Sequence, residues 1–283
     1  MIDKTFHTPG ALALRLGIPS GRIEVETVDG EETHVVLTSE DESLLEDARV
    51  ELRERSGGHE LVVEVERRRA SFLGLDIRIG PVSISKSGLH LTVRCPHGAD
   101  LNGYTASADI AARGRYGSAD LKTASGDVFV DEVTGSASAK TASGDVHLAR
   151  LGGHARFQTV SGDVTVNEAG DDVVAQLVSG DLRIDDARGS VTTKSVSGDQ
   201  MLRAVERGEV GITSVSGDIL VGIRQGSRMF VDANSVSGTM HSELDLSDAP
   251  PSGEGPMIEL RAKTVSGDVR VVRAPAREQV STS

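Results

Sequence analysis

The clearest pattern in this chain is a short alternation of apolar and polar positions that returns at a fixed interval. The segment QTVSGDVTVNEAGDDVVA, residues 158–175, shows one unit. Apolar Val164 and Val166 flank a polar residue, a corner follows near Gly170, and Val173 and Ala175 then alternate in the same way. Alternation with a period of two predicts half-buried β-strands. Each unit is therefore expected to form two short strands and two turns.

The tripeptide Ser-Gly-Asp marks the same corner of every unit. Its copies begin at Ser125, Ser143, Ser161, Ser179, Ser197, Ser216 and Ser266, with Ser237-Gly238-Thr239 as a variant. The first four intervals are 18 residues each, and the next are 19, 21 and 29. A meander tolerates drifting loop lengths, whereas stacked coils need each turn to meet its equivalent about 4.8 Å away. The constant interval predicts an all-β fold, a single-chain β-solenoid with coils of about 18 residues and two short strands each.

A fainter version of the pattern extends toward the amino terminus, where Ser-Gly corners at 20, 56 and 87 precede alternating strands. We predict that residues 1–103 form a degenerate, mostly β capping region, because the open end of a stacked sheet exposes unpaired backbone groups. One short helix is expected within 39–48, which has an N-cap candidate, early acidic residues and two Leu. Residues 67–80 are expected to form an irregular connection.

The repeat region is predicted to span residues 104–273. Its longest unit begins at Asn234 and includes the segment 247–256, SDAPPSGEGP, whose Pro and Gly residues predict a surface loop. The polar tail 274–283 is expected to be disordered.

Composition narrows the classes of partner. Only seven of 283 residues are aromatic, which suits two closely facing sheets filled by small aliphatic side chains. The net charge of −13 disfavours nucleic acid and anionic membranes as partners. The single Cys95 excludes an intrachain disulfide. No apolar stretch approaches the roughly 20 residues that span a bilayer, and the first residues lack a secretory pattern. We expect a soluble cytoplasmic protein without membrane insertion.

Stacking would place the motif Asp side chains in a row along one edge. Two unit charges about 4.8 Å apart repel by about 0.9 kcal/mol even at the dielectric constant of water. Either turn N–H groups bind these carboxylates, or cations such as Ca²⁺ bind them. Known Ca²⁺-binding solenoid repeats have a period of nine and several Gly per turn. We therefore predict a structural role and no metal or cofactor.

Enzymatic interpretations rest on Asp163 and Asp181, as acids on a sugar-binding face, or on Ser143 with His147, as nucleophile and base. A catalytic site needs a few unlike groups in one place, and a ladder repeated in every coil is the opposite arrangement. The Ser also occupies the same turn position in every unit, mostly without a His. No catalytic residues are predicted.

The remaining polar positions predict surfaces. His90, Cys95 and His97 form a tight group of possible metal ligands, but their spacing does not match a zinc site. A solvated sheet face is predicted for the outward row Lys122, Lys140, Gln158, Gln176 and Lys194. Partner contacts are expected where the repeat is broken, at Thr239, at 247–256 and in the amino-terminal region.

The repeated units, and the opening segment FHTPGALALRLGIPSGRIEVE, resemble a large bacterial family of β-strand-repeat proteins known as putative adhesins. The opening is similar to actinobacterial members, and the members have no established activity. This resemblance implies the solenoid fold and brings no site residues to transfer. The predicted function is that of a non-enzymatic scaffold or interaction protein with an unknown protein or glycan partner. The alternative is a carbohydrate-binding or carbohydrate-active β-helix protein.

Overall fold

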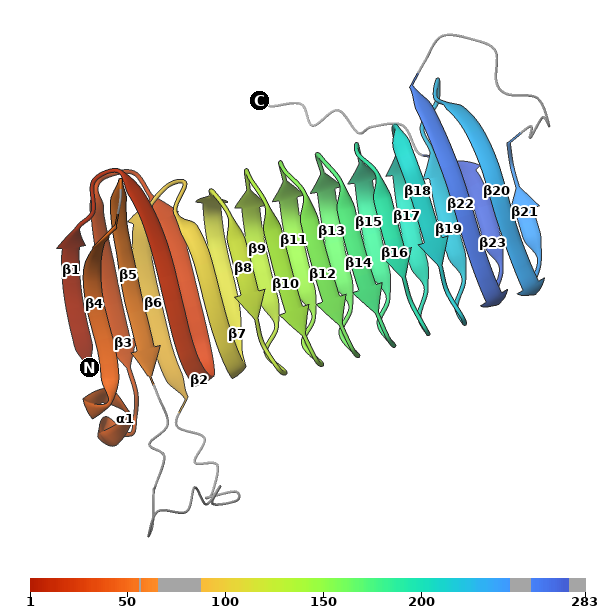
Figure 1. Cartoon of the computed structure of the whole chain (residues 1–283). Helices are drawn as coiled ribbons and strands as arrows, with labels where there is room; N and C mark the ends of the chain where they lie inside the picture. The colour runs from red at the N-terminus through yellow and green to blue at the C-terminus, as the bar shows by residue number, and fades with distance from the viewer. Residues whose placement is uncertain (56, 66–87, 245–255, 275–283) are drawn as a thin grey trace, which may run out of the picture. The chain divides into compact units, whose positions relative to one another are not determined.

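A computed structural model describes residues 1–55, 57–65, 88–244 and 256–274 (Figure 1). Strands dominate this part of the chain, and it contains one short α-helix. The all-β prediction is confirmed. Contacts group the residues into two units, Met1–Asp131 and Glu132–Ser283, which are described separately. No helix within the described ranges is long and apolar enough to cross a membrane.

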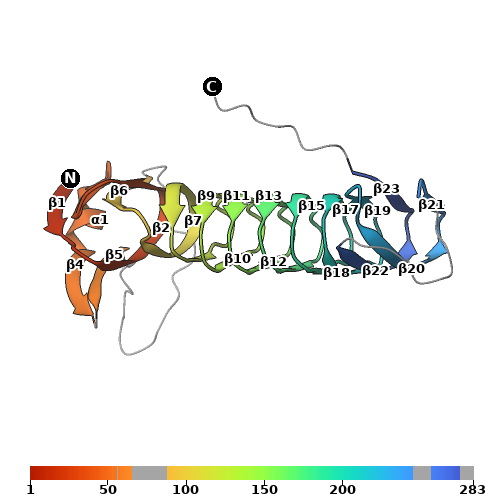
Figure 2. The ribbon, with the colours of Figure 1, turned by 90° about the horizontal axis from the view of Figure 1, so that it is seen from above.

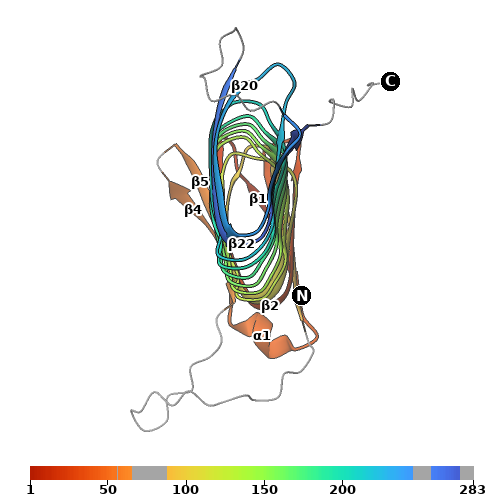
Figure 3. The same ribbon diagram turned by 90° about the vertical axis from the view of Figure 1, so that its right-hand side faces the viewer.

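The second unit is a stack of flattened coils, each made of one strand from each of two facing rows (Figures 2 and 3). The first row contains β10 (Ala137–Thr141), β12 (Ala155–Thr159), β14 (Val173–Leu177), β16 (Val191–Lys194) and β18 (Gly208–Thr213). The second row contains β11 (Val146–Leu151), β13 (Val164–Ala169), β15 (Leu182–Ala187), β17 (Gln200–Val205) and β19 (Ile219–Ile223). Within each row the strands pair in parallel. Equivalent positions of successive units therefore lie side by side, as the solenoid prediction requires.

The core of this unit lies between the two rows and consists of the inward half of the alternation. Val164, Val166, Val173 and Ala175 are each no more than 1% exposed. Fully burying a Val or Leu side chain contributes about 1.5–3 kcal/mol, and the coils repeat this burial. Phe157 is the one aromatic side chain among the largest fully buried residues of this unit. The narrow space between the rows thus accounts for the low aromatic content.

The final coils do not stack in sequence order. They contain β20 (Arg228–Ser237), β21 (Met240–Ser242), β22 (Met257–Ser266) and β23 (Val269–Arg273). Strand β22 pairs in parallel with both β18 and β20, and β23 pairs with both β19 and β21. The last coil in the sequence therefore lies inside the stack, and the coil of β20 and β21 is the terminal one. This order was not predicted from the sequence.

The first unit combines coils with antiparallel strands. It contains β1 (Ile2–His7), β2 (Ala11–Val28), β3 (Glu32–Thr38), β4 (Ala48–Arg55), β5 (Gly58–Val65), β6 (Leu89–Pro96), β7 (Asp100–Tyr116) and β8 (Ala119–Lys122). The long strand β2 pairs in parallel with β5, β6 and β7. The pairs β1–β3, β3–β6 and β4–β5 are antiparallel. The coil pattern thus continues into the amino-terminal region and gives way there to antiparallel pairing. Strand β9 (Val128–Val133) contains the boundary between the units.

The helix α1 (Glu42–Glu46) lies within the segment expected to be helical. Asp41 caps it by accepting the N–H of Ser43 at 3.0 Å. The expected domain boundary at 103/104 falls inside β7, and the division into capping and repeat regions stays a prediction. The expected connection at 67–80 lies outside the described residues, as do the loop 247–256 except Pro256 and the tail 274–283 except Ala274.

Candidate functional site at the repeat corner

In the second unit, the motif Asp side chains bind the backbone of the neighbouring coil. Each Oδ1 accepts the N–H of the next motif Asp. The donor and acceptor pairs are Asp163 to Asp145 at 2.9 Å, and Asp181 to Asp163, Asp199 to Asp181, Asp218 to Asp199 and Asp268 to Asp218 at 2.8 Å. The first unit repeats the contact, from Asp127 to Asp109 at 3.1 Å. Turn N–H groups were predicted as the donors, and in the structure these donors belong to the next coil. They offset part of the repulsion between neighbouring carboxylates.

The variant residue Thr239 ends this row. Its N–H and its hydroxyl both donate to Oδ1 of Asp268, at 2.9 Å and 2.8 Å. These bonds from the Thr239 backbone and side chain, with a weaker contribution from Arg270, lower the pKa of Asp268. Thr239 lies in the terminal coil, where no further coil of the described chain needs a carboxylate acceptor. Its position explains why the motif changes here.

Two further residue types build the corner. A Cβ atom on Gly162 would lie 2.0 Å from the carbonyl oxygen of Gly144, so only Gly allows the coils to approach this closely. The buried hydroxyl of Thr159 accepts the Gly162 N–H at 2.9 Å and donates to the Gly162 carbonyl at 3.0 Å. The Thr141 hydroxyl likewise accepts the Gly144 N–H, at 2.8 Å. In the coils that have it, the Thr two positions before the motif Ser is thus a structural element of the corner that was not identified from the sequence.

A row of exposed Val side chains runs beside the Asp row, and we call it the valine row. It consists of the six Val residues that stand immediately before a motif Ser. Their exposed fractions are Val160 49%, Val178 43%, Val196 51%, Val215 50%, Val265 49% and Val236 79%. Their order in the stack is fixed by backbone bonds, since the carbonyl of Val178 accepts the N–H of Ser197 at 2.7 Å and that of Val196 accepts the N–H of Ser216 at 2.9 Å. Repetition of Val before Ser was visible in the sequence, but its exposure was not.

The possible metal ligands of β6 do not form one site. His90 is exposed and lies 3.3 Å from Oε2 of Glu24, whereas Cys95 points into the core on the opposite face. Burial raises the pKa of the Cys95 thiol to about 12. His97 contacts the Thr27 hydroxyl instead, at 2.7 Å. Within the ranges that the structure describes, no group of three or more His, Cys, Asp or Glu could hold a metal ion.

The other candidates are spread over the coil surface. Ser143 is exposed at its corner, while His147 lies on β11 opposite Thr165 of β13. The predicted outward row is present in the second unit, where Gln158 donates to Gln176 at 2.9 Å across neighbouring coils.

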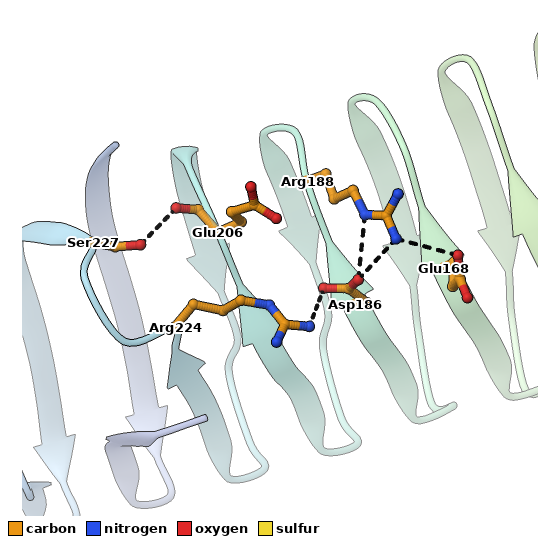
Figure 4. A network of polar contacts seen from close by, with 6 residues as sticks. All are labelled: Glu168, Asp186, Arg188, Glu206, Arg224 and Ser227. Carbon is orange, nitrogen blue, oxygen red and sulfur yellow. Dashed lines mark hydrogen bonds and ion pairs between the residues drawn. The ribbon is translucent and has the colours of Figure 1, made fainter. Parts of the chain in front are cut away.

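A polar network lies apart from the repeat motif (Figure 4). Arg224 contacts Asp186 at 2.7 Å, and both side chains are less than a fifth exposed. Arg188 contacts Asp186 and Glu168, each at 3.3 Å. Because Asp186 and Arg224 stand 38 residues apart, the pair spans two coils. The network thus joins adjacent coils through Arg188 and Glu168, and coils two apart through Arg224 and Asp186, with residues outside the Ser-Gly-Asp motif.

Two overlapping segments of the chain, 76–177 and 171–272, match the model of the Toastrack DUF4097 family. The chain belongs to the Toastrack family. This confirms the predicted kinship with β-strand-repeat proteins, and the actinobacterial detail stays a prediction. No curated protein matches this Toastrack chain.

Solved structures give matches that cover nearly all of the chain at low identity. A putative adhesin from Bacteroides fragilis is 12% identical, with 96% of each chain covered and a TM-score of 0.42. A putative adhesin from Parabacteroides merdae is also 12% identical over 96% of each chain, with a TM-score of 0.37. A putative cell adhesion protein from Clostridium sporogenes is 9% identical, covers 96% of this chain and 99% of its own, and has a TM-score of 0.28.

Proposed function

We propose that this Toastrack protein is a non-enzymatic scaffold that binds a partner protein along the valine row. The observation that carries the proposal is the exposure of six Val side chains in six stacked coils, each at least 43% exposed. Single apolar residues are common on protein surfaces, but a contiguous apolar strip is typical of an interaction site.

The corner does not require Val at this position. Ala106, Ala124 and Ala142 stand before the motif Ser or its equivalent in other coils. The corners with Ala124 and Ala142 keep the Thr–Gly hydrogen bond of the Val160 corner, since Gly126 donates to Thr123 at 2.9 Å and Gly144 to Thr141 at 2.8 Å. Val therefore adds exposed apolar surface beyond what the turn needs, and partner binding supplies a reason for it.

The chemistry of the corner supports binding rather than turnover. The Asp side chains, which repeat in every coil, serve as acceptors for backbone N–H groups of the next coil. A catalytic site instead gathers unlike groups with divergent pKa values. The Asp row also lies along the valine row, so the partner surface that fits both is apolar with Lys or Arg at its margin.

The proposal is tested by affinity purification from the native cell with matched variants. The triple variant Val178→Ala, Val196→Ala and Val215→Ala adopts the residue that other corners already contain, so we expect it to fold. The control, Val174→Ala with Thr192→Ala, changes outward residues of β14 and β16. A protein that binds the wild type and the control but not the triple variant supports the proposal. Equal recovery with all three contradicts it.

The glycan alternative predicts a different result. Binding of one dominant sugar on a glycan array, or product in a lyase or hydrolase assay, would replace the protein-binding proposal. A cytoplasmic location is part of the proposal, and fractionation of the native cell tests it.

A further inference from the structure

The terminal coil of the second unit leaves core positions open to solvent. Met240 of β21 occupies the inward position that Ile219 and Val269 hold in the preceding coils. Ile219 and Val269 are fully buried, whereas Met240 is 52% exposed. In the other row, Val231 is half-buried while its β22 neighbour Leu260 is fully buried. Figure 1 shows β20 and β21 beyond β22 and β23, at the end of this unit.

The same coil has open strand edges. In the part of the chain that the structure describes, β20 pairs with β22 alone and β21 with β23 alone. The N–H of Arg228 donates to the carbonyl of Pro256 at 2.8 Å, so it points toward β22. Because backbone groups alternate in direction along a strand, those of Met229 and Val231 point to the open edge. Such an edge is a template for another strand.

The order of side chains on β20 indicates which strand fits. Phe230 lies on the outer face and is 48% exposed, with basic Arg228 two residues before it and acidic Asp232 two residues after it. Met229 and Val231 lie on the inner face, opposite buried residues of β22. The strand is therefore self-complementary about Phe230, with opposite charges at equal distances on either side.

We propose that the open edge of β20 pairs in antiparallel fashion with β20 of a second copy of this chain, with the two Phe230 side chains opposite each other. In this register Arg228 of each copy faces Asp232 of the other on the outer face, and Met229 faces Val231 on the inner face. Met229 and Val231 are also the residues whose backbone groups point to the open edge, so they form the hydrogen-bonded pairs.

A two-fold contact of this kind uses one patch on both copies. Aromatic pairs and opposite-charge pairs are the cross-strand neighbours that stabilise antiparallel strands. In this arrangement Met229 and Val231 of the two copies cover each other on the inner face. A partner with another sequence would need no charge symmetry about Phe230. This inference is independent of the proposed use of the valine row.

Charge exchange tests the register. The full chain is studied by sedimentation velocity at about 0.15 M salt, where the Debye length of about 8 Å screens the repulsion between acidic chains. The wild type is expected to form a dimer. Arg228→Asp makes both outer positions acidic and Asp232→Arg makes both basic, so each variant alone is expected to dimerise at least about tenfold more weakly. An equimolar mixture of the two variants is expected to form the heterodimer, because every facing pair is then opposite in charge.

Lys194→Asp and Glu209→Arg make the same charge changes on outward positions of inner coils, and they are expected to leave the dimer intact. Formation of the heterodimer in the mixture shows that both β20 variants, Arg228→Asp and Asp232→Arg, are folded. A wild type that remains monomeric at every accessible concentration overturns the proposal. Variants that dimerise as well as the wild type, or a mixture that does not associate, overturn the β20 register.

Discussion

At each corner, the motif Asp carboxylate is subject to two opposing effects. Its neighbours in the row repel it by about 0.9 kcal/mol each at the dielectric constant of water. The N–H of the next Asp, at about 2.8 Å in most coils, stabilises it. The bond needs an acceptor oxygen at this place, and Thr239 shows that the acceptor is dispensable in the terminal coil.

We therefore predict that the side-chain oxygen of Asp181 contributes more to the stability of the fold than its negative charge does. Asp181→Ala removes the acceptor of the Asp199 N–H and is expected to lower the free energy of unfolding by about 1–2 kcal/mol. Asp181→Asn keeps an oxygen and relieves repulsion from Asp163 and Asp199, so its stability should equal or exceed that of the wild type. Urea denaturation measures both. If Asn destabilises as much as Ala, the charge itself is required and a bound cation becomes the better explanation.

Gln200 is a polar residue that lies in the apolar core between the two rows. It is 1% exposed and holds the inward position of Leu182 and Ile219 in the adjacent coils. Neither atom of its amide has a hydrogen-bond partner among the residues that the structure describes. A buried amide without partners costs about 1–3 kcal/mol on protein scales.

Gln200→Leu is therefore expected to raise the free energy of unfolding by about 1–3 kcal/mol, because Leu matches its neighbours and has no polar atoms. Urea denaturation again measures the change. The outward substitution Thr192→Leu is the control and should change stability little. A loss of stability in Gln200→Leu would show that the amide is satisfied in solution.

At the scale of elements, alternation determines which residues form strands, whereas contacts outside the motif join coils that are not adjacent. The Asp186–Arg224 pair joins β15 to the end of β19, two coils apart, and both side chains are largely buried. Removing one partner of a buried pair leaves the other charge without compensation. The pair thus resists separation of these coils.

We expect Asp186→Ala to lower the free energy of unfolding by about 2–3 kcal/mol, less than for a fully buried pair because both side chains retain some exposure. Arg224→Ala should have a smaller effect, because Asp186 keeps its contact with Arg188 at 3.3 Å. The double variant should cost less than the sum of the single changes, and a double-mutant cycle by urea denaturation measures this coupling. Additive effects would mean that the two side chains do not interact.

The sequence predicted the elements well because period-two alternation and a constant interval both reflect burial between two rows. Val164 and Val166 could be assigned to the core from pattern alone. The insertion of β22 between β18 and β20 was not predicted, since the coils share the same alternation and all but the one with Thr239 share the same motif. Strand neighbours are specified by register and by connecting segments, which the repeat does not encode.

The same reasoning explains what was missed at the site. The Asp residues were recognised as a row, but the identity of the donor depends on how far each coil is offset from the next. Gln200 and the valine row break the usual association of apolar residues with burial. In the sequence, Val178 looks like Val173, because the sharp corner, rather than hydrophobicity, determines which of them faces solvent.

At the scale of the whole molecule, the stacked coils of the second unit present an extended surface. Successive corners present the same groups about 4.8 Å apart, so a binding partner meets a strip of apolar side chains beside a strip of carboxylates. The net charge of −13 favours a partner with basic groups. Binding along a strip also predicts that affinity depends on several coils at once, with no single residue essential.

The most direct test of this account is photo-crosslinking in the native cell. A photoreactive amino acid is placed at Val178, in the middle of the valine row, or at Thr165, which faces outward from β13. The account predicts a discrete crosslinked protein from position 178 and none from position 165. Crosslinks of equal yield at both positions, or from position 165 alone, would contradict the claim that the valine row binds the partner.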